Sequence, residues 1–268
     1  MNYTRKLALL NVLAFLGTII MNLLANLLPI NNITTGEVAA LYPNLFTPAA
    51  ITFSIWGLIY TLLGIFTVYQ LIVAFKPQET AKTFVDRIGL WNFVLGIGNM
   101  LWILAWHYQY IGISVIIMLI MLTSLIIIYR RLGIGKTSKK KAEVLLVDIN
   151  FSVYLGWISI ATIANITTFL VAINWDGFGI SPVVWTIIVM TVGVVLGLLF
   201  ILLYRDIFYA LVVDWALLGI YLKRTAEETV AVRPIISWSI IGMIIISLAI
   251  LVAIMKRRVY IRNVDYIK

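Results

Sequence analysis

The sequence predicts an all-α protein, a polytopic transmembrane bundle of about eight helices. Hydrophobic residues make up 63% of the 268 residues and charged residues only 12%, whereas soluble globular chains contain roughly 25% charged residues. All six prolines fall at or between the ends of long apolar segments, where a missing backbone N–H does not interrupt a helix. These observations predict an integral membrane protein, with the lipid bilayer as its first partner.

The first two helices are expected over residues 7–28 and 48–75. The first segment has 22 residues, which exceeds the roughly 7–15 residues of a signal-peptide core, so we expect a helix that is retained in the protein. The second is expected to begin with Thr47 as its N-cap and Pro48 at its first helical position. The intervening loop contains neither Lys nor Arg.

The next three helices are expected over residues 88–106, 111–129 and 144–171. A short uncharged turn separates the first two, and a strongly basic loop precedes the third. At about 1.5 Å per residue, the third would be about 42 Å long. This length exceeds a hydrocarbon core of about 30 Å, so we expect this helix to tilt or to project from the bilayer.

The last three helices are expected over residues 182–204, 207–222 and 234–255. Ser181 followed by proline is a cap-plus-proline start for the first of them, and another proline opens the last. The segment 207–222 has only 16 residues. It is therefore either a short crossing or a re-entrant segment.

The distribution of basic residues predicts that both termini are cytoplasmic. With eight crossings, 17 of the 20 Lys and Arg residues lie on the inner side, and only Lys223, Arg224 and Arg233 lie outside. This bias follows the positive-inside rule, and we expect a bacterial inner membrane. The net charge of +9 is therefore interpreted as an orientation signal, and no nucleic-acid partner is expected.

Several classes of chemistry lack the residues they need. The chain has no cysteine and one histidine, which excludes disulfides, thiolate ligands and a multi-histidine metal centre. No paired carboxylates or Ser–His arrangement suggests hydrolysis. The sequence favours a non-enzymatic protein, and it leaves open an enzyme that acts on a tetrapyrrole or a lipid.

Aromatic and amide side chains recur at helical spacing in the second, third and fifth predicted helices. Spacings of three and four residues place such side chains on one helix face. We expect these faces either to converge on a ligand pocket or to be helix-packing contacts whose amides pair across helices. The candidate ligand-binding residues are Phe53, Trp56, Tyr60, Asn99, Trp102, Tyr154, Trp157, Ala161 and Asn165.

Two features of the C-terminal part also suggest roles. Asp214 lies midway along the seventh segment, and an ionisable group at that depth in a membrane is costly, so it is a candidate proton or ion site. Gly193 and Gly197 form a GxxxG pattern in the sixth helix. That pattern is compatible with a close helix contact within the chain or across a homodimer.

Three motifs in register resemble the tryptophan-rich sensory protein family, also called the translocator protein or peripheral-type benzodiazepine receptor family. They are W-x-x-x-Y, N-x-L-W, and Y-x-x-W with an asparagine eight residues beyond the tryptophan. The residues that carry them are Trp56 and Tyr60, Asn99 and Trp102, and Tyr154, Trp157 and Asn165. The resemblance covers roughly residues 1–172, with Thr47 and Ala50 where the family usually has proline and tryptophan.

The resemblance implies a five-helix bundle over residues 1–172, often dimeric, to which residues 173–268 add about three helices. It also implies binding of a porphyrin-type or heme-type tetrapyrrole, or another flat hydrophobic ligand, for sensing or transport. No certain cofactor follows from it. The alternative function is a proton-coupled small-molecule transporter in which the added helices and Asp214 complete the path.

Overall fold

The structure is a computed structural model that describes residues 2–76, 83–227 and 229–262. These residues contain no β-strand, so the predicted all-α class is confirmed. The first half comprises α1 (Tyr3–Leu27), η1 (Ile30–Asn32), α2 (Thr35–Ala40), η2 (Ala50–Ser54), α3 (Ile55–Phe75), α4 (Phe84–Ile88), α5 (Trp91–His107) and α6 (Ile111–Leu132). The second half comprises α7 (Lys141–Glu143), the π-helical η3 (Val144–Asp148), α8 (Ile149–Ala172), η4 (Gly177–Gly179), α9 (Pro182–Tyr204), α10 (Ile207–Thr225), η5 (Val230–Val232), α11 (Arg233–Met255) and η6 (Tyr260–Arg262).

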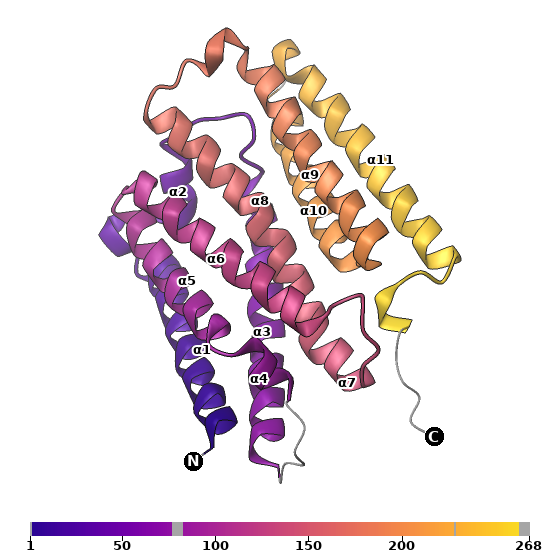
Figure 1. The fold of residues 1–268 in the computed structure, drawn as a ribbon. Helices are drawn as coiled ribbons and strands as arrows, with labels where there is room; N and C mark the ends of the chain where they lie inside the picture. The colour runs from indigo at the N-terminus through magenta and orange to yellow at the C-terminus, as the bar shows by residue number, and fades with distance from the viewer. Residues whose placement is uncertain (1, 77–82, 228, 263–268) are drawn as a thin grey trace.

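The long helices lie side by side as a bundle (Figure 1). Within the described ranges, six helical segments are long and apolar enough to cross a membrane. Two more, α5 with 17 residues and α10 with 19, pack along them. The chain enters α1 and leaves α11 at the same end of the bundle (Figure 1), here called the terminal end.

The outer surface of the bundle is apolar along its length. Leu13, Ile20, Ile116, Leu202 and Leu248, from four of the long helices, are each more than half exposed. Such a surface suits hydrocarbon, and the helical hydrogen bonds satisfy the backbone groups that lipid cannot. The protein is an integral membrane protein.

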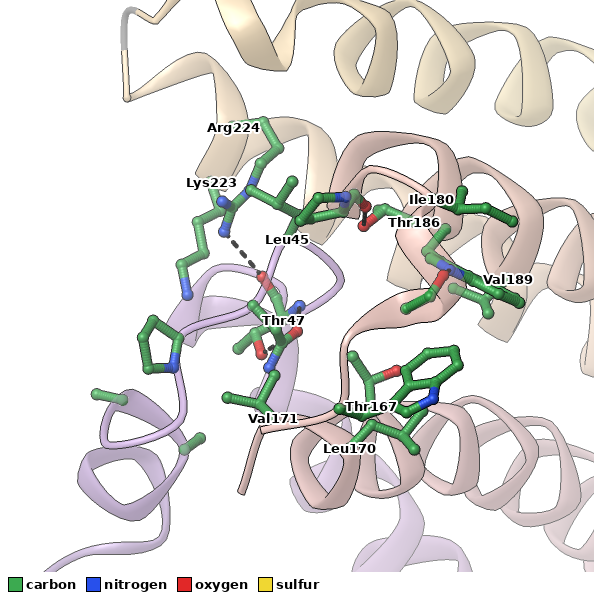
Figure 2. Close-up of a pocket in the computed structure, with 18 of the residues that line it drawn as sticks. Leu45, Thr47, Thr167, Leu170, Val171, Ile180, Thr186, Val189, Lys223 and Arg224 are labelled. Atoms are coloured by element: carbon green, nitrogen blue, oxygen red, sulfur yellow. Dashed lines mark hydrogen bonds between the residues drawn. The ribbon is translucent and has the colours of Figure 1, made fainter. Parts of the chain in front are cut away.

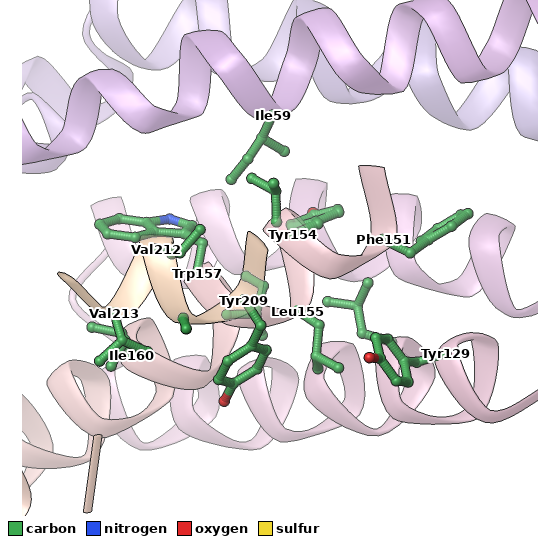
Figure 3. Packing of buried hydrophobic residues seen from close by; sticks show 14 of the residues in the cluster. Ile59, Tyr129, Phe151, Tyr154, Leu155, Trp157, Ile160, Tyr209, Val212 and Val213 are labelled. Atoms are coloured by element: carbon green, nitrogen blue, oxygen red, sulfur yellow. The ribbon is translucent and has the colours of Figure 1, made fainter. Parts of the chain in front are cut away.

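Helix α8 lies at the centre of the bundle and packs against α3, α6 and α10. An 18-residue apolar stretch of the segment Lys141–Ala172, which contains α8, is 78% buried, whereas the same measure is 22–39% for the other five candidate spans. In Figure 3, side chains of α8 such as Phe151 and Leu155 lie between Ile59 of α3, Tyr129 of α6 and Tyr209 of α10. Residues 150–160 of α8 are therefore covered by protein on all sides, whereas the second half of the helix is partly exposed.

The expected start of the second helix is wrong. The N–H and the hydroxyl of Thr47 both donate to the Asn44 side-chain oxygen, at 2.9 and 3.0 Å, so Thr47 belongs to a turn and caps no helix. The N–H of Ala49 donates to the Gly219 carbonyl oxygen at 2.9 Å. The helix therefore begins only at Ala50, because the preceding residues are held by contacts outside it.

The seventh predicted segment is longer than expected. Helix α10 runs without a reversal from Ile207 to Thr225, three residues past the predicted end, so the re-entrant alternative does not hold. Asp206 caps it by accepting from the N–H groups of Phe208 and Tyr209, at 3.0 and 3.2 Å. At about 1.5 Å per residue its 19 residues extend about 28 Å, which nearly matches the bilayer core.

Asp206 also ties the C-terminal helices to the rest of the bundle at the terminal end. Its carboxylate accepts from the hydroxyls of Tyr129 and Ser152, at 2.8 and 2.6 Å, and Ser152 in turn lies 3.1 Å from the Tyr260 hydroxyl. Burial raises the pKa of Asp206, and the hydrogen bonds from Ser152 and Tyr129 oppose that shift. These contacts join α6, α8, α10 and the segment after α11.

The GxxxG pattern forms contacts within the chain. A methyl group at Gly193 would lie 3.3 Å from Ile160 of α8, and one at Gly197 would lie 3.4 Å from Ile246 of α11. Both glycines therefore let α9 approach its neighbours closely, which is one of the two expected roles of the pattern.

Candidate functional site

The predicted aromatic faces meet around a small cavity between α3, α5, α8 and α10, here called the bundle cavity. Its volume is about 70 Å³. Six of the nine candidate residues line it, namely Phe53, Trp56, Trp102, Trp157, Ala161 and Asn165. Tyr60, Asn99 and Tyr154 do not line it. The three helix faces thus converge, as expected, but enclose little space.

The aromatic rings fill most of the volume between the helices by packing against one another. Trp56 stacks on Tyr60 with ring centroids 5.3 Å apart, and meets Tyr154 and Trp157 edge-on at 6.0 and 6.1 Å. Phe53 meets Trp157 edge-on at 6.0 Å. Such edge-on and offset arrangements are the favourable ones for aromatic pairs. The cluster is therefore a packed core with a cavity at one side.

Two of the predicted amides are paired across helices. The Asn22 amide donates to the Asn99 side-chain oxygen at 2.9 Å. Asn165 accepts from the Trp102 indole N–H at 2.8 Å and donates to the Ser114 hydroxyl at 2.9 Å. These pairs are what the helix-packing interpretation expects, and they hold Trp102 in one orientation at the cavity wall.

The Trp157 indole N–H is different, because it has no acceptor among the described residues. Trp157 is 3% exposed and lines the bundle cavity. An unpaired buried donor costs roughly 1–3 kcal/mol. A ligand with an acceptor atom in the cavity would relieve that cost, so Trp157 is a donor suited to orient such a ligand.

Helix α10 contributes a wall of the bundle cavity that contains none of the predicted site residues. Ala216 and Ile220 line it, together with Phe46 and Pro48 from the loop after α2. A methyl group at Gly219 would lie 1.9 Å from the Thr52 hydroxyl oxygen, so only glycine permits this approach. A glycine inside an otherwise apolar helix is the one sequence signal of this contact.

A second and larger cavity, here called the large cavity, lies beside the first and has a volume of about 590 Å³. It is bounded by the end of α8, the 174–181 loop, the start of α9 and the end of α10 (Figure 2). Leu170, Val171, Ile180 and Val189 contribute apolar surface, and Lys223 belongs to its lining.

The segment 43–47 separates the two cavities and is here called the partition. Leu45 faces the large cavity, Phe46 lines the bundle cavity, and Thr47 lines both. The Asn44 side chain holds the turn by accepting three hydrogen bonds from residues 46 and 47. The Arg224 guanidinium donates to the Thr47 carbonyl oxygen at 3.4 Å, which ties the partition to α10 (Figure 2).

The structure places Asp214 away from both cavities. Its carboxylate accepts from the Ser247 hydroxyl of α11 at 2.9 Å, and its other oxygen has no partner among the described residues. Asp214 lines neither the bundle cavity nor the large cavity. It therefore joins α10 to α11 and is separate from the aromatic cluster.

The comparisons with known proteins agree with the motifs. The sequence model described as TSPO-like protein matches residues 8–253, which covers most of the chain and includes α9, α10 and most of α11. No curated protein and no solved structure matches the chain.

Proposed function

Because the chain belongs to the TSPO-like protein family, we propose that it binds a flat hydrophobic ligand in the bundle cavity. A porphyrin-type tetrapyrrole is the first candidate. The observation that carries the proposal is the buried Trp157 indole N–H without an acceptor, in a cavity lined by aromatic rings. Such a site offers stacking surface and a donor that orients the ligand.

A tetrapyrrole needs more space than the bundle cavity holds in this conformation. Pockets that take drug-sized ligands measure roughly 300–1,000 Å³, against about 70 Å³ here. The partition has room to move, because the large cavity lies directly behind it. We therefore propose that binding displaces the partition toward the large cavity and enlarges the bundle cavity.

Fluorescence titration of the purified protein with protoporphyrin tests this function. We expect saturable quenching of tryptophan emission. Trp157→Phe keeps a ring but removes the N–H, and it should raise the Kd about five- to tenfold. Trp238→Phe is the matched control, because the Trp238 indole N–H is also buried and unpaired among the described residues but lies outside the bundle cavity.

Two results would contradict the proposal. One is quenching that does not saturate. The other is an equal Kd for the wild-type protein, Trp157→Phe and Trp157→Ala. If Trp238→Phe lost as much affinity as Trp157→Phe, the loss would be due to altered packing and not to a contact between Trp157 and the ligand.

Proton-coupled transport is the second candidate function. It is supported by the Asp214 carboxyl, which has one oxygen without a partner in the described part of the chain, on a helix that packs among the other long helices. Uptake or efflux driven by a pH gradient in vesicles, and lost in Asp214→Asn, is the expected result. Transport that is equal in Asp214→Asn and wild type would exclude this role.

We also propose that both termini are cytoplasmic and that the membrane is a bacterial inner membrane. The proposal is supported by the bias of Lys and Arg toward one side of the bundle. Labelling of single cysteines introduced into this cysteine-free chain, from either side of sealed vesicles, should mark a residue near α1 and one near α11 from the same side.

A further inference from the structure

The large cavity combines apolar walls with a basic edge. Leu170, Val171, Ile180 and Val189 provide the apolar surface. Lys223 and Arg224, at the end of α10, lie on the side opposite Ile180 (Figure 2). Its volume of about 590 Å³ falls within the range of pockets that hold small-molecule ligands.

The two basic side chains differ in whether they have hydrogen-bonding and ion-pair partners. Arg224 is 3% exposed, and its guanidinium forms an ion pair with Glu227 at 2.7 Å and donates to the Thr47 carbonyl oxygen. The Lys223 ammonium forms no hydrogen bond or ion pair with any residue that the structure describes. Arg224 is therefore already neutralised, whereas Lys223 has three donors to offer.

Neither carboxylate of the lining, Glu227 or Asp176, forms an ion pair with Lys223. Glu227 is engaged by Arg224. Asp176 accepts from the Phe178 N–H at 3.0 Å. A negative group on a ligand would be paired by Lys223 without displacing an existing ion pair.

We propose that the large cavity binds an amphipathic anion, whose acidic group pairs with Lys223 while its apolar part lies on the α8 and α9 walls. The acidic group is a carboxylate or a phosphate. It is supplied either by a free fatty-acid-like molecule or by the headgroup of an anionic lipid. This site is separate from the bundle cavity, and it does not depend on the function proposed there.

Quenching by brominated amphiphiles tests the site, because Trp175 and Trp185 line the large cavity. The full chain in a non-ionic detergent is titrated with dibromostearate, with its methyl ester, with dibromo-phosphatidylglycerol and with dibromo-phosphatidylcholine. We expect saturable quenching by the free acid. Lys223→Gln should raise the Kd for dibromostearate about tenfold, which is the effect typical of losing one charge-assisted contact.

Lys256→Gln is the matched control. It removes the same charge from an exposed residue at the end of α11, and it should leave the Kd unchanged. Saturable quenching by dibromo-phosphatidylglycerol as well would assign the natural ligand to the lipid, and quenching by the free acid alone would assign it to a soluble amphiphile. Trp157→Phe should not alter these titrations, so this site and the bundle cavity can fail independently.

Three results would overturn the proposal. They are equal Kd values for Lys223→Gln and Lys256→Gln, equal binding of the acid and its methyl ester, and quenching by dibromo-phosphatidylcholine as strong as that by either anion. Each would show that the charge of Lys223 does not select the ligand. Absence of saturable quenching by both anions would also overturn it.

Discussion

The bundle cavity and the large cavity lie on opposite sides of the partition and are built differently. Four residues of the family motifs line the bundle cavity, yet its volume is about 70 Å³. The large cavity contains none of those motif residues, yet its volume is about 590 Å³. Aromatic residues that converge from several helices pack against one another, whereas space forms where helix ends and loops diverge. A concentration of tryptophan in a sequence therefore marks a meeting point of helices more directly than it marks a void.

The two cavities also differ in their polar groups. At the bundle cavity the Asn165 amide is paired, and the Trp157 indole N–H has no acceptor among the described residues. At the large cavity Arg224 is paired, and Lys223 has no ion-pair partner among the described residues. The first arrangement suits a neutral acceptor on a flat ligand, and the second suits an anion. The following variants test whether this division holds.

Asn165→Leu should have the largest effect on stability. It removes the acceptor of the half-buried Trp102 indole N–H and a hydrogen bond to Ser114, and it leaves the Trp102 N–H unpaired. We expect a loss of about 2–4 kcal/mol, measured as a lower Tm in detergent. Asn26→Leu, at an exposed position of α1, is the control and should change the Tm little. Equal Tm values for the two variants would mean that the Asn165 network does not hold the cavity wall.

Gly219→Ala should have the next largest effect. The added methyl group would lie 1.9 Å from the Thr52 hydroxyl oxygen and 2.9 Å from Pro48, so α10 and the loop beside the partition must separate. Overpacking of this kind costs about 1–3 kcal/mol. Gly57→Ala is the control, since its methyl group would meet nothing within 4 Å and should be neutral or slightly stabilising. A Gly219→Ala protein as stable as Gly57→Ala would show that this contact does not position α10.

Arg224→Gln should change the rate of ligand entry. It removes the ion pair with Glu227 and weakens the hydrogen bond between α10 and the Thr47 carbonyl oxygen that holds the partition. If the partition moves when the bundle cavity is filled, protoporphyrin quenching in stopped flow should become about two- to fivefold faster. An unchanged rate, with an unchanged Kd, would mean that the ligand reaches the bundle cavity without moving the partition.

Asp214→Asn should have the smallest effect on binding and stability. The new amide oxygen can still accept from the Ser247 hydroxyl, so we expect a change in stability within about 0.5 kcal/mol. The affinities of both cavities should be unchanged, because Asp214 lines neither. A large loss of protoporphyrin or dibromostearate affinity in Asp214→Asn would show that the contact between α10 and α11 affects ligand binding in the cavities.

Much of the architecture followed from residue patterns. The start of α9 at Pro182 after Ser181, and the start of α10 at Ile207, lie where the sequence placed them. Caps, prolines and the length of apolar runs act locally, so they can be recognised without knowing the fold. The start of the helical segment formed by η2 and α3 differs from the prediction because the N–H of Ala49 donates to Gly219, a residue 170 positions away that no local pattern reveals.

By itself, the sequence determined that this chain is an apolar helical bundle, which of its residues share a helix face, and to which family it belongs. Helical spacing sets the direction in which a side chain points, because it depends only on the 3.6-residue turn. The tertiary structure decided how far apart the facing helices stand, which polar groups find partners, and that α10 closes the bundle. Those outcomes depend on contacts between distant segments, such as Gly219 against Thr52 and Arg224 against Thr47, and packing of this kind is not periodic along the chain.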